Sequence, residues 1–149
     1  MFIEEISSKE IIELLERARL GRIACAQKGQ PYVVPFYFVH SEGFLYSFTA
    51  IGRKIHWMRA NPLVCVEVDE IANSREWSTV IIYGSYEELP DTPETQFKRE
   101  FAWELLQQYP TWWEPALAAS EFKTAGSYEP LFYRIHISQM TGRRARPGA

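Results

Sequence analysis

Six short apolar segments, each bounded by residues typical of turns, constrain the fold of this 149-residue chain more than any other feature. Their content of Val, Ile, Tyr and Phe is typical of β-strands, and the short links between most of them favour antiparallel neighbours. We expect strands over residues 22–26, 32–40, 44–49, 63–68, 77–87 and 131–137.

Because closing such a sheet removes its exposed edges, we predict a mainly β fold with flanking helices. The strands are expected to form a six-stranded antiparallel barrel, as a single domain over residues 1–149. The interior of so small a barrel is too narrow for a cofactor, so a ligand has to bind outside, in a groove whose second wall a second subunit can supply.

Three segments have the spacing of amphipathic helices. Ser7 and Glu10 form a capping box ahead of a helix expected over 8–20, with Gly21 as its C-cap. A short helix is expected over 53–59, ended by Asn61-Pro62. A third starts at Thr92-Pro93-Glu94 and runs to about Gln108, and its buried stripe is expected at Phe97, Phe101 and Leu105. Another helical piece is indicated by Trp112, Trp113, Ala116 and Leu117; with Trp103, these tryptophans either pack over the barrel or cover a ligand.

The charge balance and the cysteines exclude several classes of protein. Lys plus Arg total 16 and Asp plus Glu total 19, and the net charge of −3 gives no general attraction to nucleic acid or to an anionic membrane. The first residues carry acids where a signal peptide carries bases, and no apolar run is long enough to span a membrane. We therefore expect a soluble, cytoplasmic protein. Cys25 and Cys65 lie in apolar runs and are expected to be buried reduced thiols, with no metal site.

Residues 47–54, Ser-Phe-Thr-Ala-Ile-Gly-Arg-Lys, join a strand end to a helix start. Arg53 and Lys54 stand in the first helical turn, where the helix dipole disfavours positive charge by about 0.3–1 kcal/mol each. A bound phosphate would compensate, because free amide N–H groups, the Thr49 hydroxyl, close backbone approach at Gly52 and two cations together suit an anion. The alternative is a solvated helix start with Thr49 as an ordinary N-cap.

The strand expected over 32–40 is apolar on both faces, so neither face suits bulk water and one must meet something besides the barrel core. Pro35 confines it to a sheet edge or a bulge, where free backbone groups could pair with a ligand. Phe36, Tyr37 and Phe38 add flat apolar surface that would suit a planar heteroaromatic ring. The alternative is a strand packed between the core and a helix or a second chain.

No side chain is an obvious catalytic base. The three histidines lie on different elements, each expected to be a surface or hydrogen-bonded residue: His40, His56 and His136. Three acids at a strand end could bind a cation, although a solvated loop is the favoured interpretation: Glu67, Asp69 and Glu70. The basic residues Arg143, Arg144 and Arg146 are expected to form a frayed tail, or alternatively to reach a second subunit's phosphate.

An ordered succession of motifs resembles a known family. The motifs are GRIA at 21–24, PYVVP at 31–35, LYSFTA at 45–50, GRK at 52–54, RANP at 59–62, VCVEV at 64–68 and VIIYG at 80–84. Together they resemble the pyridoxamine 5′-phosphate oxidase-related FMN-binding split-barrel proteins, in particular the nitroimidazole-resistance-like flavin-nucleotide-binding branch. Each motif is weak alone, but their order over roughly residues 8–90 is fairly specific.

The resemblance implies FMN bound at the interface of a homodimer. It places the phosphate on Arg53 and Lys54 beside Gly52, with Ser47, Phe48 and Thr49 around it. It places the isoalloxazine along the strand formed by Tyr32, Val33, Val34, Pro35, Phe36 and Tyr37. It assigns Ser78 and Thr79 to the strand with which a second subunit closes the site.

Two departures limit what the resemblance implies about substrate. The chain ends Ile-Ser-Gln-Met-Thr-Gly-Arg-Arg at 137–144 instead of the Arg-Leu-x-Pro type of segment, so oxidation of vitamin B6 phosphates is not expected. Residues 47–49 lack the histidine often found in nitroimidazole-resistance proteins, so the resemblance does not imply nitroimidazole reduction. The function expected is that of an FMN-dependent oxidoreductase of unknown small-molecule substrate. The alternatives are a deazaflavin- or haem-binding split barrel and a non-catalytic flavin-binding or interaction module.

Overall fold

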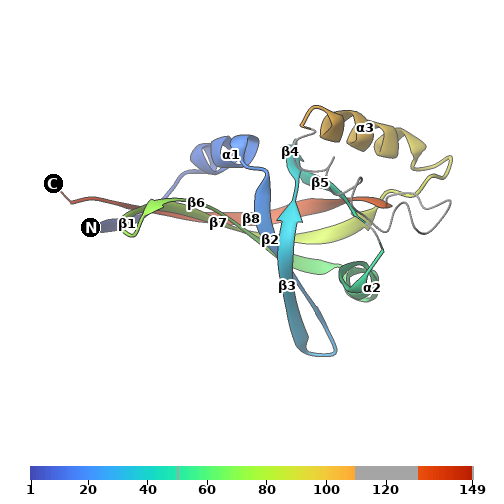
Figure 1. Cartoon of the computed structure of the whole chain (residues 1–149), viewed down its shortest axis with the longest axis horizontal. Helices are drawn as coiled ribbons and strands as arrows, with labels where there is room; N and C mark the ends of the chain where they lie inside the picture. Colours follow the sequence, from blue (N-terminus) through green and yellow to red (C-terminus); the bar gives the residue numbers. More distant parts are fainter. Residues whose placement is uncertain (50, 110–130, 149) are drawn as a thin grey trace.

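A computed structural model describes residues 1–49, 51–109 and 131–148 of the chain (Figure 1). In chain order the elements are β1 (Phe2–Glu5), α1 (Ser8–Arg17), β2 (Leu20–Gln27), β3 (Gln30–Tyr37), β4 (Val39–Ser41), β5 (Phe44–Thr49), α2 (Arg53–Ala60), β6 (Leu63–Asn73), β7 (Glu76–Glu88), α3 (Gln96–Gln107) and β8 (Leu131–Arg146). The helical piece expected around Trp112 and Trp113 lies outside the described residues.

The strands form one antiparallel sheet that curls into a barrel. Its order is β3-β2-β6-β7-β8-β5-β4, with β1 paired to β8 beside this path. The two strands at the ends of the order, β3 and β4, are separated in the chain only by Phe38, so the sheet must curve until its edges meet. The predicted mainly β antiparallel barrel with flanking helices is confirmed. The described residues form eight strands rather than six, because Phe38 divides the strand expected over 32–40 and because β1 adds a strand that was not predicted.

Three long strands carry the sheet beyond the barrel. We call this extension the arm: residues 69–79 of β6 and β7, residues 141–146 of β8, and β1. It reaches to the left in Figure 1, where both ends of the chain lie. The prediction that the basic C-terminal residues form a frayed tail is wrong, because Arg143 and Arg144 pair with Thr79 and Ser78 in β7. Arg144 is further fixed by carboxylates, with Nη2 2.9 Å from Glu4 Oε1 and Nη1 2.6 Å from Glu10 Oε2.

The barrel interior is filled by its own side chains, as its small diameter requires. Val66, Ile82, Tyr133 and Ile135 have no exposed surface. A second apolar cluster lies under α3 and is formed by Val39, Tyr46, Phe48, Leu89, Ala102, Leu106 and Phe132. Cys25 is buried in the core and Cys65 is half-buried. Both are free thiols, and burial raises the pKa of each.

Helix α1 begins as predicted and ends earlier. The Ser7 hydroxyl accepts a hydrogen bond from the Glu10 amide at 3.2 Å, and the helix buries Ile11, Leu14 and Leu15. It ends at Arg17 because Leu20 already belongs to β2. Gly21 is therefore not a helix cap. It is a strand residue at which a Cβ would lie 2.7 Å from the Glu67 carbonyl oxygen, so close packing of β2 on β6 requires glycine there.

Helix α3 buries a different face from the one expected. Phe97 is 81% exposed and Phe101 is 42% exposed, whereas Ala102 and Leu106 are fully buried. Leu105 and Trp103 are half-buried against the second cluster, and Trp103 lies edge-on to Phe132 at a centroid distance of 5.9 Å. Both candidate stripes repeat at four-residue spacing, so periodicity alone could not choose between them.

Candidate functional site

The start of α2 holds a lysine that is largely withdrawn from water and that has no anionic partner among the described residues. Burial lowers the pKa of Lys54, and a Cys25 thiolate is the group that would oppose this shift. The Lys54 ammonium lies 5.9 Å from the centre of the Tyr133 ring. Within the described ranges, Lys54 forms no ion pair with a carboxylate. A desolvated cation without a counter-ion is unfavourable, and an anion bound here would remove the penalty.

Arg53 lies beside Lys54 and is tied to β3. Its guanidinium carbon is 5.4 Å from the centre of the Tyr32 ring, and Tyr32 also packs on Trp57 of α2 with ring centres 5.3 Å apart. Arg53 is exposed and forms no ion pair in the part of the chain that the structure describes. The structure thus brings together Tyr32, Arg53 and Lys54, which the sequence assigned to one site.

The helix start itself is open to an anion. Gly52 is the N-cap residue and supplies no side-chain hydrogen bond, and the first turn of α2 contains no acidic residue. Gly52 has φ −151°, which is extended backbone that any residue adopts, and no described atom lies within 4 Å of the position a Cβ would occupy. Neither backbone conformation nor crowding therefore requires glycine here. The unmet amide N–H groups of the first turn remain available to a ligand.

The preceding strand β5 contributes less side-chain chemistry than expected. Ser47 is buried, and its hydroxyl donates to the Tyr37 carbonyl oxygen at 2.7 Å, which joins β5 to β3. Phe48 points into the cluster under α3, with its ring 5.7 Å from that of Phe132. Thr49, half-buried at the end of β5, pairs with Leu131. The side chains of Ser47 and Phe48 are thus engaged in the fold.

Tyr133 is a site residue that sequence reasoning missed. Its side chain is completely buried beneath Lys54, and its hydroxyl has no hydrogen-bond partner among the described residues. Burial raises the pKa of this phenol far above its ordinary range, and the neighbouring Ser47 hydroxyl opposes the shift only in part. A buried hydroxyl without a partner is uncommon in folded proteins. No sequence pattern places Tyr133 under Lys54.

The edge strand β3 alternates between the core and the surface. Phe36 and Phe38 are buried in the core, with ring centres 5.4 Å apart, so they do not add to the flat outer surface that was expected. Within residues 32–37 of β3, the side chains that face outward are those of Val33, Pro35 and Tyr37, and Val33 is 60% exposed. Pro35 lies in an edge strand rather than at a bulge, because β3 ends the sheet order and pairs with β2 without a register shift.

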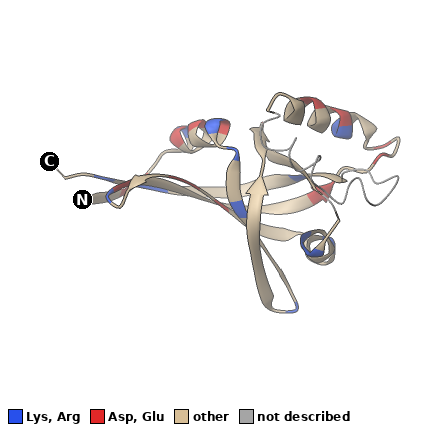
Figure 2. Cartoon of the chain, viewed as in Figure 1, with Lys and Arg blue, Asp and Glu red and all other residues tan. Residues whose placement is uncertain are grey.

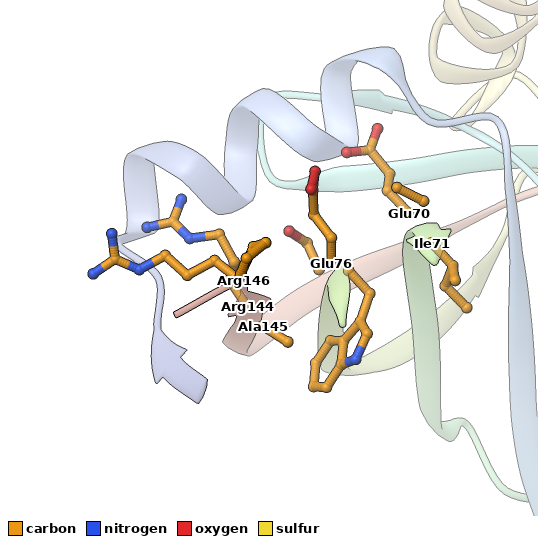
Figure 3. Close-up of a pocket in the computed structure, with 10 residues that line it drawn as sticks. Glu70, Ile71, Glu76, Arg144, Ala145 and Arg146 are labelled. Atoms are coloured by element: carbon orange, nitrogen blue, oxygen red, sulfur yellow. The ribbon is translucent and has the colours of Figure 1, made fainter. Parts of the chain in front are cut away.

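Ser78 and Thr79 lie in the arm, away from α2. Ser78 pairs with Glu70, whereas Leu63 at the α2 end of β6 pairs with Ser85. Seven positions at about 3.3 Å per residue place Ser78 about 23 Å from Ser85 along β7. Ser78 lines a surface hollow of about 830 Å³, together with Trp77, Glu70, Ile71 and Arg144 (Figure 3). Within one chain, these two residues and Lys54 do not form a common site.

The remaining candidates have structural partners. His40 is buried, with Nδ1 3.0 Å from Glu16 Oε1, and His136 packs on Phe44 at a ring distance of 5.2 Å. The acids at 67, 69 and 70 lie within β6 rather than in a loop, and Glu70 is 2.6 Å from Arg17. In the described part of the chain, no group of three or more His, Cys, Asp and Glu side chains could hold a metal ion. No helix among the described residues is both long and apolar enough to cross a membrane.

Comparisons with known proteins agree with this architecture. A family model described as pyridoxamine 5′-phosphate oxidase matches residues 7–144. An uncharacterized protein of Rhizobium meliloti is 38% identical over 149 residues, 99% of each chain. The crystal structure of an FAD-binding protein from Mesorhizobium loti is 43% identical with a TM-score of 0.80, covering 97% of this chain and 99% of that one. A candidate 5-nitroimidazole antibiotic resistance protein from Bacteroides thetaiotaomicron shares the fold, with a TM-score of 0.69 at 19% identity over 97% of this chain and 89% of that one.

Proposed function

Because this chain belongs to the pyridoxamine 5′-phosphate oxidase family, we propose that it is a flavin-nucleotide-binding oxidoreductase. We propose that FMN is the cofactor and that it binds at the interface of a homodimer. The observation that carries the proposal is the desolvated Lys54 ammonium, which has no ion-pair partner among the described residues. It lies at an α2 N-terminus that also lacks a side-chain cap and an acidic residue in its first turn.

The described residues fit a phosphate at this position. Lys54 and Arg53 provide two cations without carboxylate partners in the described part of the chain, and the first turn of α2 provides amide donors at Gly52 and beyond. Tyr133 provides a buried hydroxyl with no described partner next to Lys54. A dianion would favour the charged form of Lys54, opposing the effect of burial on its pKa, and would offset the helix-dipole penalty of both bases.

The flavin ring is proposed to lie along the outer side of β3. Val33, Pro35 and Tyr37 face outward there, and the edge strand has backbone groups not used by the β2 ladder. Ser78 and Thr79 are proposed to approach from the second subunit, because their own chain holds them at the far end of β7. When bound, a flavin supplies the electron or hydride transfer, and the protein supplies binding and orientation.

FAD is a second candidate cofactor. The Mesorhizobium loti protein at 43% identity is named an FAD-binding protein, and FAD contains the same phosphate nearest the flavin. Release of the bound cofactor by denaturation, followed by chromatography, identifies it. Recovery of FMN supports the primary proposal, recovery of FAD supports the second candidate, and a haem or deazaflavin spectrum contradicts both.

The decisive variant is Lys54→Ala. A charge-assisted hydrogen bond contributes about 1.5–3 kcal/mol, so we expect flavin affinity to fall by about 10- to 100-fold in a titration followed by flavin fluorescence. Lys9→Ala is the matched control, because Lys9 is an exposed lysine in the first turn of α1, remote from the site. Unchanged affinity in Lys54→Ala, or an equal loss in Lys9→Ala, contradicts a phosphate site at α2.

A further inference from the structure

A cavity of about 480 Å³ lies between α1, the β4–β5 hairpin and the middle of β8. We call it the α1 cavity, and its walls include Ile12 and Glu16 of α1, His40 of β4, Glu42 of the β4–β5 turn and residues 137–140 of β8. Cavities of this size hold small organic molecules. Gln139 lies six positions beyond Tyr133 along β8, about 20 Å at about 3.3 Å per residue. The α1 cavity is therefore separate from the candidate site at Lys54.

The α1 cavity lies beside a stretch of β8 that has a strand neighbour on one side only. β5 pairs with β8 as far as His136, and β1 pairs with it from Arg143 onwards. Between these two partners, no strand of the described chain pairs with that edge of β8. The space is thus a gap in the strand pairing, with α1 as one of its walls.

A β-bulge shapes the floor of the α1 cavity. The pairing of β7 with β8 shifts by one residue between Tyr83 and Gly84, which leaves Ser138 as an extra residue without a partner on β7. At Gly84 a Cβ would lie 2.5 Å from the His136 carbonyl oxygen, so this close approach requires glycine. Bulges often occur next to active sites, where they redirect a side chain. The exposed side chains of Ser138 and Gln139 both line the cavity, and neither has a hydrogen-bond partner among the described residues.

His40 is a buried imidazole with a fixed orientation at the wall of the α1 cavity. Its side chain is 6% exposed, and Nδ1 lies 3.0 Å from Glu16 Oε1. Because a carboxylate only accepts hydrogen bonds, Nδ1 carries a proton, and in the neutral ring Nε2 is then an acceptor. Nε2 forms no hydrogen bond with any described residue. A buried acceptor of this kind requires a donor from a ligand or from water.

The α1 cavity is negatively charged. Glu16 and Glu42 line it, and in the described part of the chain no residue that lines it is Lys or Arg. Glu42 is exposed and forms no hydrogen bond or ion pair within the described ranges. Helix α1 carries charges of both signs (Figure 2), but Arg17 Nη2 is held 2.6 Å from Glu70 Oε1 of the arm. Arg19 donates to two main-chain carbonyl oxygens and lies 3.7 Å from the Tyr109 ring centre, so it does not neutralise the cavity either.

We propose that the α1 cavity binds a small organic cation, a primary amine in its ammonium form attached to an apolar body. The ammonium supplies the donors that His40 Nε2 and the Glu42 carboxylate accept. The apolar body packs on Ile12, Ile137 and Met140, which line the same cavity. A metal ion does not suit these side chains, because no group of three or more His, Cys, Asp and Glu among the described residues could hold one. The inference goes beyond the proposed function and does not depend on it.

The chemistry of the ligand is tested by titrating the full-length chain at neutral pH with three probes that share one skeleton: hexylammonium, hexanol and hexanoate. Protein-observed NMR measures the affinity of each. We expect hexylammonium to bind about tenfold or more tightly than hexanol, because its hydrogen bonds are charge-assisted. Hexanoate is expected to bind least, because Glu16 and Glu42 repel it. A hexylammonium ion that does not saturate the protein, or that binds no more tightly than hexanol or hexanoate, overturns the proposal.

The position of the site is tested with Glu42→Gln, which removes the charge of an exposed side chain and keeps its size. Affinity for hexylammonium is expected to fall about fivefold, the upper range for an exposed ion pair. Ile12→Lys, at a position 40% exposed, adds a repelling charge and is expected to abolish binding. Glu13→Gln is the matched control, because Glu13 is an exposed acid of α1 that does not line the cavity. Wild-type affinity in Glu42→Gln or in Ile12→Lys, or an equal loss in Glu13→Gln, overturns the proposal.

The role of His40 is tested on the wild type, so that no variant of a buried residue is needed. Two-dimensional NMR that correlates imidazole protons with both ring nitrogens should show the proton of the neutral His40 ring on Nδ1. Saturating hexylammonium is expected to shift the Nε2 resonance of His40 and to leave that of His56, which does not line the cavity, unchanged. A neutral His40 ring with its proton on Nε2, or a His40 resonance that does not move at saturation, overturns the proposal.

Discussion

At the scale of single residues, the start of α2 consists of residues that folding does not need. Gly52 is neither crowded nor in a left-handed conformation, Arg53 is exposed, and Lys54 loses hydration without gaining a described carboxylate. Residues that lower the stability of the ligand-free protein are expected at a binding site, because the bound ligand offsets their unfavourable free energy.

Gly52→Asp tests this separation of binding from stability. An aspartate N-cap satisfies amide N–H groups of α2 and complements its dipole, so we expect the free energy of unfolding to rise by about 0.3–1 kcal/mol. The same carboxylate repels a phosphate, so flavin affinity should fall by tenfold or more. Urea denaturation and flavin titration measure the two effects.

Gly52→Asn is the control, because it caps the helix without adding charge. It should stabilise α2 to a similar degree and weaken flavin binding less than Gly52→Asp does. A Gly52→Asp variant that binds flavin like the wild type would show that no anion docks at this helix start.

Sequence reasoning identified the basic pair correctly as a feature of α2 but could not foresee its surroundings. Arg53 and Lys54 follow from composition at a helix start, whereas the contact of Lys54 with Tyr133 depends on how β8 is positioned by β5 and β7. Phe36 shows the same limit. A strand that is apolar on both faces does not reveal which face is the core, and the core side proved to hold Tyr32, Val34 and Phe36.

At the scale of elements, α3 shows how tertiary packing decides between two equivalent stripes. The cluster under the helix contains Phe48 of β5, Phe132 of β8 and Leu89 just after β7, and it accepts Ala102 and Leu106. The small side chain of Ala102 lets α3 approach the sheet closely. If the larger side chain of Phe101 faced the sheet instead, the helix would lie further from it.

Leu106→Ala should therefore destabilise the protein strongly. Removing a fully buried leucine costs about 2–5 kcal/mol through lost burial and the cavity left behind, whereas Phe97→Ala at an exposed position should change the free energy of unfolding by less than about 0.5 kcal/mol. Chemical denaturation of the two variants compares the buried and the exposed face of α3. An equal loss in the free energy of unfolding for both variants would contradict the orientation of α3.

At the scale of the whole molecule, electrostatics links stability to pH. The pKa of Glu67 is raised in the folded chain, so the native state binds more protons than the unfolded state between the ordinary carboxyl range and about pH 7. The free energy of unfolding therefore falls as pH rises through that window. The hydrogen bond from Arg17 lowers the pKa of Glu70, so that pair loses its contribution only at more acidic pH.

Urea denaturation between about pH 5 and pH 8 checks the sign. We expect the Glu67→Gln variant to gain stability relative to the wild type as pH rises, because it lacks the carboxylate that must charge. A difference between the two that stays constant with pH would contradict the raised pKa.

The general architecture was predictable from turns and alternation, but the reach of β8 was not. Residues 138–146 include serine, glutamine, threonine, glycine and three arginines, a composition typical of a loose end. They form a strand because β7 on one side and β1 on the other supply backbone partners, and because Arg144 finds Glu4 and Glu10. Such long-range pairing leaves no local signal in the sequence.

The central position of β8 has a consequence for biosynthesis. This strand lies between β7 and β5 and also pairs with β1, yet it follows all three along the chain. A nascent polypeptide can form the β2–β3 and β6–β7 hairpins while still attached to the ribosome, but the two halves of the sheet stay unjoined until Leu131–Arg146 has emerged. Barrel closure is thus a late event, and contacts such as Phe2 with Arg146 make a slow final step the expected one.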